Sequence, residues 1–150
     1  MIKLKTIVSY MIVYDADDQI LGRLCSIIAK KLLQGENVTV VNAEKTVLSG
    51  NSKEKKEHYL GKISRGDVFK GPFFPRVPDQ IFRRTVRGML PWDKTRGREA
   101  YRKLKVFIGI PAGLEKAKFE KVSEADASRL KTKSMKLGEL TMLIGAKKRW

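Results

Sequence analysis

The chain has 150 residues, of which 42% are hydrophobic, so it is long enough for one domain and too apolar for disorder to be the default. A domain of this length buries roughly 70% of the surface that its unfolded chain exposes. The 32 Lys and Arg against 16 Asp and Glu leave a formal net charge of +16, and no apolar run approaches the ~20 residues of a membrane-spanning helix.

The first third of the chain predicts a βαβ unit. Residues 11–15, MIVYD, form a short apolar run before the turn-prone DADD, which is typical of a strand. The apolar residues of 21–35, LGRLCSIIAKKLLQG, recur at helical spacing, and Gly35 suits the helix end. Residues 37–43, NVTVVNA, are nearly continuously apolar and predict a second strand that is covered on both faces. This order indicates parallel strands joined by a right-handed crossover.

The apolar stretch Ile7–Tyr14 ends in Asp15 without a small-residue cleavage site, so it predicts a strand after a basic leader rather than a signal peptide. Cys25 is the single cysteine, lies among apolar neighbours and is expected in the core, which is consistent with a reducing cytoplasm.

The middle of the chain predicts two helices around an irregular loop. Ser49 or Ser52 is expected to cap a polar helix through SKEKKEHYLGK. Residues 63–78 hold three Pro and two Gly, and a loop of that length in a compact domain indicates a role for the loop. Asp79 is expected to start a helix, DQIFRRTVRGML, that ends near Pro91, because the residue before proline avoids helical angles.

The last third predicts a short helix, GREAYRKL, a third strand, KVFIGI, before Pro111, and a terminal helix, KLGELTMLIG, closed by Gly145. Strands that alternate with helices indicate a parallel sheet with helices on both faces. The predicted fold class is therefore α/β, in a single domain.

Positive charge is concentrated between residues 62 and 105, which carry 13 basic and 4 acidic side chains. Such an excess opposes compaction unless an anionic partner neutralises it, and nucleic acid is the commonest such partner. No acidic residue lies between Asp79 and Asp93, whereas a solvated helix face normally mixes signs. The pattern therefore favours a helix that faces an anion.

That helix combines an apolar face with a basic one, and the apolar residues fall within about 60° on a helical wheel of ~100° per residue. The apolar face is formed by Phe82, Val86 and Met89. The basic face is formed by Arg83, Arg84 and Arg87. Arginine suits this role because its planar fork binds two phosphate oxygens at once.

Other basic side chains extend the predicted RNA-binding surface through the flanking loops and the next helix. The predicted set is Arg83, Arg84, Arg87, Lys94, Arg96, Arg98, Arg102, Lys103, Lys62, Arg65 and Lys70. Aromatic residues near basic ones can stack on unpaired bases. Trp92 fits base stacking and anchoring of its loop equally well, whereas Phe73 and Phe74 favour anchoring.

The sequence predicts no catalytic or metal site. One His and one Cys argue against zinc, and His58 is expected on the surface of its polar helix. Asp15, Asp17 and Asp18 are interpreted as a turn rather than a cation site.

Two segments that follow the predicted strands can accept a phosphate through free N–H groups. They are DDQILGR, residues 17–23, and LSGNSKE, residues 48–54. Open parallel sheets bind ligands at the carboxyl ends of their strands. Neither segment matches the dinucleotide-binding or P-loop pattern, so they support a nucleotide-using enzyme only weakly, and a phosphate of an RNA backbone remains an alternative.

Four blocks in order, DADDQILGRLCSIIAKKLLQG, VVNAEKTVLSGN, GPFFPRVPDQIFRRTVRGMLP and RGREAYRKLKVFIGIP, closely resemble the universal large-subunit ribosomal protein family thirteen, in its archaeal and eukaryotic branch. The resemblance implies a three-layer α/β/α fold on a parallel sheet of about four strands. It covers residues 11–112, expected to be the rRNA-binding domain, and leaves 113–150 as a basic C-terminal extension with a terminal helix. Residues 1–10 fit the family poorly and are interpreted as an N-terminal extension, with Met11 as an alternative start. The family's basic helix and turn fall on Arg83, Arg84, Arg87, Gly88, Met89, Leu90 and Pro91. Its next basic segment falls on Arg96, Gly97, Arg102, Lys103, Leu104, Lys105 and Val106.

The resemblance further implies a structural, non-enzymatic protein that binds large-subunit rRNA, takes part in early subunit assembly and supports translation in the cytoplasm. Expected partners are that rRNA and neighbouring large-subunit ribosomal proteins, with no cofactor, metal, membrane, small-molecule substrate or homo-oligomer. The alternatives are an RNA- or nucleotide-processing enzyme, which needs a catalytic constellation, and an mRNA-binding translational regulator, which would use the same basic surface.

Overall fold

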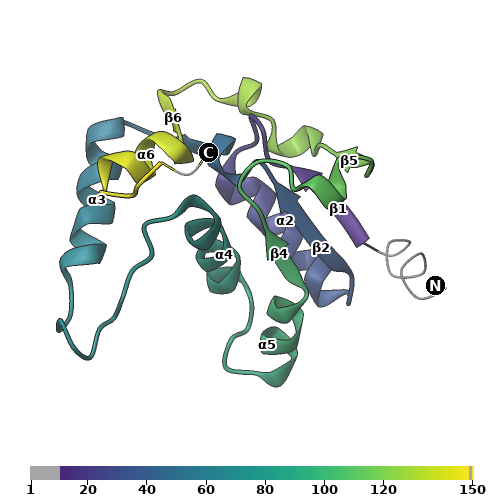
Figure 1. Ribbon diagram of the computed structural model, residues 1–150, viewed down its shortest axis with the longest axis horizontal. Coiled ribbons are helices and arrows are strands. Elements are labelled where there is room, and N and C mark those ends of the chain that lie inside the picture. Colours follow the sequence, from purple (N-terminus) through teal and green to yellow (C-terminus); the bar gives the residue numbers. More distant parts are fainter. Residues whose placement is uncertain (1–10, 149) are drawn as a thin grey trace.

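A four-stranded parallel sheet organises the chain in the computed structural model, which describes residues 11–148 and 150 (Figure 1). The extension expected at residues 1–10 lies outside the described residues. The strand order is β4-β2-β1-β5, and every neighbouring pair is parallel. The four strands are β1 (Met11–Asp15), β2 (Asn37–Val41), β4 (Leu104–Val106) and β5 (Phe119–Glu120). The predicted α/β fold class and the parallel sheet of about four strands are confirmed.

Five α-helices and a small second sheet complete the described fold. The helices are α2 (Leu21–Leu33), α3 (Ser52–Ser64), α4 (Pro78–Met89), α5 (Thr95–Arg102) and α6 (Leu137–Leu143). The second sheet pairs β3 (Val47–Ser49) with β6 (Ser134–Lys136) antiparallel. Single 3-10 turns are η1 (Ala43–Lys45), η2 (Ala112–Leu114), η3 (Ser123–Ala125) and η4 (Ala127–Arg129). None of the helices described is long and apolar enough to cross a membrane.

The predicted βαβ unit is confirmed, with one boundary corrected. β1 and β2 pair in register over five residues, and α2 connects them. Gly35 follows the helix with a φ of 96°, as a left-handed helix end requires. β2 ends at Val41 rather than at Ala43, because Asn42 takes a φ of 56° and turns the chain out of the sheet.

One predicted helix cap and one predicted helix start are wrong by one or two residues. Asn51, rather than Ser49 or Ser52, caps α3, and its side chain accepts a hydrogen bond from the Lys53 backbone N–H. α4 begins at Pro78 rather than Asp79, because proline needs no N–H partner in the first turn of a helix. The predicted end of α4 before Pro91 is confirmed.

The strands outside the βαβ unit were predicted least accurately from the sequence. The third predicted strand starts one residue earlier, at Leu104, and ends at Val106 rather than Ile110. The fourth strand, β5, has two residues, which is too short to show any alternation. It pairs with β1 through Phe119 and Glu120 and completes the sheet.

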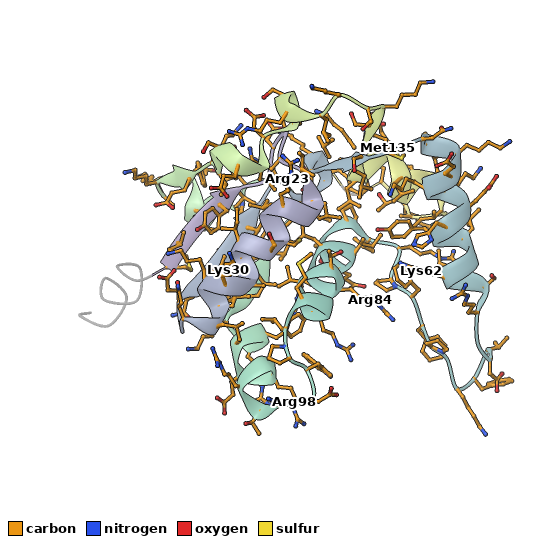
Figure 2. All side chains as sticks on the ribbon, turned by 180° about the vertical axis from the view of Figure 1, so that it is seen from behind. Arg23, Lys30, Lys62, Arg84, Arg98 and Met135 are labelled. Atoms are coloured by element: carbon orange, nitrogen blue, oxygen red, sulfur yellow. The ribbon has the colours of Figure 1, made fainter. Side chains whose placement is uncertain are left out.

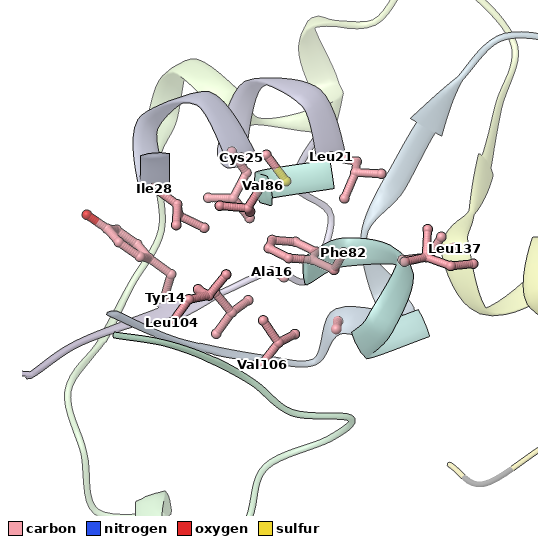
Figure 3. Packing of buried hydrophobic residues seen from close by; sticks show 14 of the residues in the cluster. Tyr14, Ala16, Leu21, Cys25, Ile28, Phe82, Val86, Leu104, Val106 and Leu137 are labelled. Carbon is pink, nitrogen blue, oxygen red and sulfur yellow. The ribbon is translucent and has the colours of Figure 1, made fainter. Parts of the chain in front are cut away.

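The core lies between the sheet and the pair of helices α2 and α4 (Figure 3). Phe82 and Val86 of α4 are fully buried there, as predicted. Met89 is instead 41% exposed, because it stands at the last residue of the helix, and Ile81 takes its place on the buried face. Cys25 is buried as predicted, and burial raises the pKa of its thiol. Residues 113–150 contribute to the same core through Ala125, Met135, Leu137, Leu140 and Ile144.

The turn between α4 and α5 depends on a glycine. Gly97 is buried in the first turn of α5, and a Cβ built there would overlap the carbonyl group of Pro91. Gly88 in α4 has ordinary helical surroundings, and a Cβ there would meet no atom within 4 Å. The two glycines therefore differ in what they do for the fold.

We predict that Gly97→Ala lowers the free energy of unfolding by about 1–3 kcal/mol, because the added methyl forces the α4–α5 turn apart. The matched control Gly88→Ala should leave it unchanged or raise it by up to about 1 kcal/mol, since alanine favours helix. Urea denaturation followed by circular dichroism measures both. Equal midpoints for Gly97→Ala and the unmodified chain would contradict the prediction.

Candidate nucleic-acid interface

α4 carries the three central arginines on the side opposite its buried face. Ile81, Phe82 and Val86 hold the helix against α2 and the sheet. Arg83 and Arg84 are half-buried and Arg87 is exposed. The helix is thus fixed by its apolar residues, and its basic residues project from a rigid element.

Each of these guanidinium groups lies over an aromatic ring. The three pairs, with the distance from Cζ to the ring centroid, are Arg83 over Tyr101 at 5.1 Å, Arg84 over Phe74 at 4.7 Å and Arg87 over Trp92 at 4.1 Å. Such a contact is worth about 0.5–1 kcal/mol at an exposed site. A contact with an aromatic ring leaves the positive charge of the guanidinium available to phosphate oxygens. The rings therefore position the arginines without neutralising them.

No carboxylate neutralises the predicted site residues within the part of the chain that the structure describes. The ion pairs found there are Lys31–Glu36, Lys121–Asp15 and Lys136–Asp18. The hydrogen bonds of the α4 arginines are equally sparse: an Arg84 Nη1–H donates to the Phe73 carbonyl at 3.2 Å, and Arg83 Nε is buried without a partner among the described residues. This surface keeps its full positive charge.

The aromatic residues divide into anchors and exposed rings. Trp92 packs edge-on against Tyr101, with ring centroids 5.3 Å apart, and the Arg87 guanidinium covers its ring. Phe74 packs edge-on against the buried Tyr59. Phe73, in contrast, is 70% exposed. Trp92 thus has a visible structural role, and its stacking on a base stays a prediction.

Lys62 joins the arginine cluster from α3. Its Nζ lies 5.2 Å from the Tyr59 ring and 5.7 Å from the Phe74 ring, the same ring that Arg84 covers. Figure 2 shows Lys62 and Arg84 on α3 and α4, with the loop that carries Phe74 between these helices. Two cations distant in sequence are therefore brought to one aromatic side chain.

The other predicted basic residues spread around this centre. Lys94, Arg96 and Arg98 are exposed on the turn and on α5, and an Arg98 N–H donates to the Asp93 carbonyl at 3.3 Å. Lys103 bonds back to the Gly35 carbonyl at 3.0 Å, at the end of α2. Arg102 and Lys103 line a separate hollow beside β2, so they are not part of the α4 cluster.

Arg65 and Lys70 lie on the irregular loop between α3 and α4, which projects from the domain (Figure 1). The loop is tied by paired backbone hydrogen bonds between Asp67 and Gly71, at 3.1 and 3.0 Å. Val68 and Phe69 between them are 82% and 89% exposed. The loop thus presents both basic and apolar side chains away from the core.

A groove of about 700 Å³ lies beside the arginine cluster, between α2, β3, α3 and α4. It contains two cations that sequence reasoning missed, Arg23 and Lys55, together with Lys62 and Arg84. Neither was named as a candidate, because periodicity shows which residues of a helix are buried but not which helices meet. The available signal was the pair of phosphate-accepting segments, since parts of both, at 20–23 and 48–49, line this groove.

The acidic residues at the end of β1 and just after it stabilise the turn. Asp15 Oδ1 accepts hydrogen bonds from the Asp17 backbone N–H at 3.1 Å and from Asn42 Nδ2 at 2.9 Å. No group of three His, Cys, Asp or Glu side chains among the described residues is arranged to hold a metal ion.

His58 is exposed, as predicted, and its pKa reflects the electrostatic potential around α3. The pKa of its imidazole is lowered from the ordinary value, chiefly by the positive charge of Lys62 and further by desolvation, Lys55 and Arg65. A lowered histidine pKa beside three cations indicates positive potential at this side of α3.

Comparison with known proteins gives one consistent result. The sequence profile of the family described as "Ribosomal protein L13" matches residues 9–113. Three archaeal relatives are each named large ribosomal subunit protein uL13. That of Methanopyrus kandleri is 51% identical over 136 residues, 89% of this chain and 86% of its own. That of Archaeoglobus fulgidus is 49% identical over 144 residues, 95% and 92% of the two chains. That of Aeropyrum pernix is 44% identical over 140 residues, 91% and 90%.

We predict that Lys62→Gln raises the pKa of His58, because removal of the nearest positive charge favours the imidazolium. Binding of a polyanion should raise it too. Since the chain has one histidine, its imidazole signal in a proton NMR titration reports this pKa without assignment. Lys118→Gln, which is not among the causes of the shift, is the control and should leave the midpoint unchanged.

Proposed function

This chain belongs to the ribosomal protein L13 family, and on that premise we propose that it binds large-subunit rRNA through the cationic face of α4 and acts early in assembly of the subunit. The family consists of structural, non-enzymatic proteins of the large ribosomal subunit, so the chain works on the ribosome in the cytoplasm. The archaeal origin of the relatives agrees with the branch expected from the sequence.

The rRNA proposal rests on how Arg83, Arg84 and Arg87 are positioned and on their lack of an acidic partner. They lie on one rigid helix, are held by aromatic rings, and have no carboxylate partner within the described residues. A fixed array of unneutralised guanidiniums matches the dense phosphates of folded RNA, which proteins recognise largely by shape.

The remaining predicted residues extend this face and contribute to RNA binding to different extents. Lys62, Lys94, Arg96 and Arg98 adjoin α4 and bind phosphates with it. Arg65 and Lys70 reach RNA from the projecting loop, whose exposed apolar residues contact either RNA bases or a neighbouring large-subunit ribosomal protein. Arg102 and Lys103 belong to the far end of α5 and make a secondary contact.

We predict that Arg83→Gln, Arg84→Gln and Arg87→Gln combined reduce incorporation of the chain into large subunits without unfolding it. The substitution removes the phosphate partners and leaves the buried face of α4 intact. Sucrose-gradient sedimentation of cell lysate measures incorporation, and circular dichroism of the purified variant checks the fold.

A control with Lys116, Lys118 and Lys131 changed to Gln removes the same charge from exposed positions in the last third of the chain. It should sediment with large subunits like the unmodified chain. If the arginine variant also does so, the cationic face of α4 is not the RNA contact.

Binding of the full chain to purified large-subunit rRNA should weaken steeply as salt increases, because neutralised phosphates release counterions. The logarithm of the binding constant should fall linearly with the logarithm of salt concentration, and the arginine variant should show a slope smaller by roughly 2, at ~0.7–0.9 per phosphate. Filter binding at several salt concentrations measures the slope. An unchanged slope would show that these arginines meet no phosphate.

A further inference from the structure

Two helical glycines line the groove between α2, α3 and α4, and the fold does not require either of them. Gly22 and Gly88 have no left-handed φ, and a Cβ at either would meet no atom within 4 Å. Glycine in a helix is less favourable than alanine by about 1 kcal/mol. Because glycine has no side chain, both positions leave the groove open.

The groove has the charge of an anion site. Arg23, Lys55, Lys62 and Arg84 line it, and none of its lining residues is acidic. They come from three different helices, α2, α3 and α4, which Figure 2 shows through the labelled Arg23, Lys62 and Arg84. Arg23 Nη1 donates to the Glu124 carbonyl at 3.3 Å, a contact that positions the guanidinium without neutralising it.

The groove is continuous with the cationic face of α4. Arg84 and Gly88 line both it and the neighbouring hollow formed with Arg87, Pro91 and Trp92. Gly88 is exposed and has no side chain, so α4 offers little obstruction there between the groove and this second hollow, which Arg84, Arg87 and also Asp93 line. An extended polyanion that lies along the arginines can pass over it, whereas a compact ligand would occupy one hollow only.

We propose that a single-stranded segment of RNA crosses α4 at Gly88 and enters this groove, where Arg23 and Lys55 bind its phosphates. The inference rests on the proposed function and extends it from one helix face to a path for a strand. A volume of about 700 Å³ lies within the ~300–1,000 Å³ of clefts that enclose ligands of nucleotide size. RNA is favoured over an acidic peptide because the groove continues the surface that faces rRNA.

Variants that place a bulky, negatively charged side chain in the groove test the proposal. Gly88→Glu and Gly22→Glu each place a carboxylate in the groove, and Gly61→Glu places the same group at an open helical position of α3 outside it. For Gly88→Glu and Gly22→Glu, the dissociation constant of the full chain for purified large-subunit rRNA should rise about tenfold or more. The reason is that the new carboxylate repels RNA phosphates ~10 Å away near the protein surface. The Gly61 variant should bind within about twofold of the unmodified chain. Equal effects of the three folded variants would overturn the proposal.

Arg23→Gln with Lys55→Gln separates this inference from the proposed function, because neither residue belongs to the α4 face. The salt slope of rRNA binding should decrease by roughly 1.4, at ~0.7 for each phosphate of a single strand. If this slope is unchanged while the arginine variant of α4 lowers it, the groove holds no RNA and the α4 contact stands. If rRNA binding is unchanged but incorporation into subunits falls, an acidic segment of a neighbouring protein occupies the groove, which also overturns the proposal.

Discussion

The burial of one face of α4 is the interaction on which the rest of this surface depends. Three arginines within five residues repel one another, and no carboxylate within the described residues balances them. The helix persists because Ile81, Phe82 and Val86 are removed from water against α2 and the sheet. A fully buried phenylalanine or isoleucine contributes ~1.5–3 kcal/mol, several times the repulsion of a solvated like-charge pair. Hydrophobic packing therefore offsets the concentration of charge.

Aromatic residues solve a second problem, which is how to order long cationic side chains without cancelling their charge. A salt bridge would hold a guanidinium but would also neutralise it. Tyr101, Phe74 and Trp92 contact the three guanidiniums and leave their charge available. This arrangement explains why aromatic residues occur among the basic ones in this part of the sequence, and it gives Trp92 a structural role that its sequence position left open.

The fold gathers cations from separate helices onto one side of the domain. α2 follows β1, α3 follows β3, and α4 returns across α2, so Arg23, Lys62 and Arg84 reach one groove from positions more than 60 residues apart at the extremes. Packing between helices distant in sequence makes this possible, because α4 packs against α2 and α6 contacts both α3 and α4. The positive potential that lowers the pKa of His58 has a local source, chiefly Lys62 and further Lys55 and Arg65, which lie on α3 itself or at its end.

The sequence by itself determined the βαβ unit, the burial of Cys25, Phe82 and Val86, and the basic face of α4, since each depends on a local period of apolar or charged residues. The family resemblance rested on ordered blocks of residues and needed no coordinates. Only the tertiary structure decided which aromatic ring meets which arginine, that the short β5 completes the sheet, and that Arg23 and Lys55 share a groove with α4. These features depend on contacts between residues far apart in the chain. The sequence pattern shows the periodicity of each helix or strand but not how two of them pack against each other.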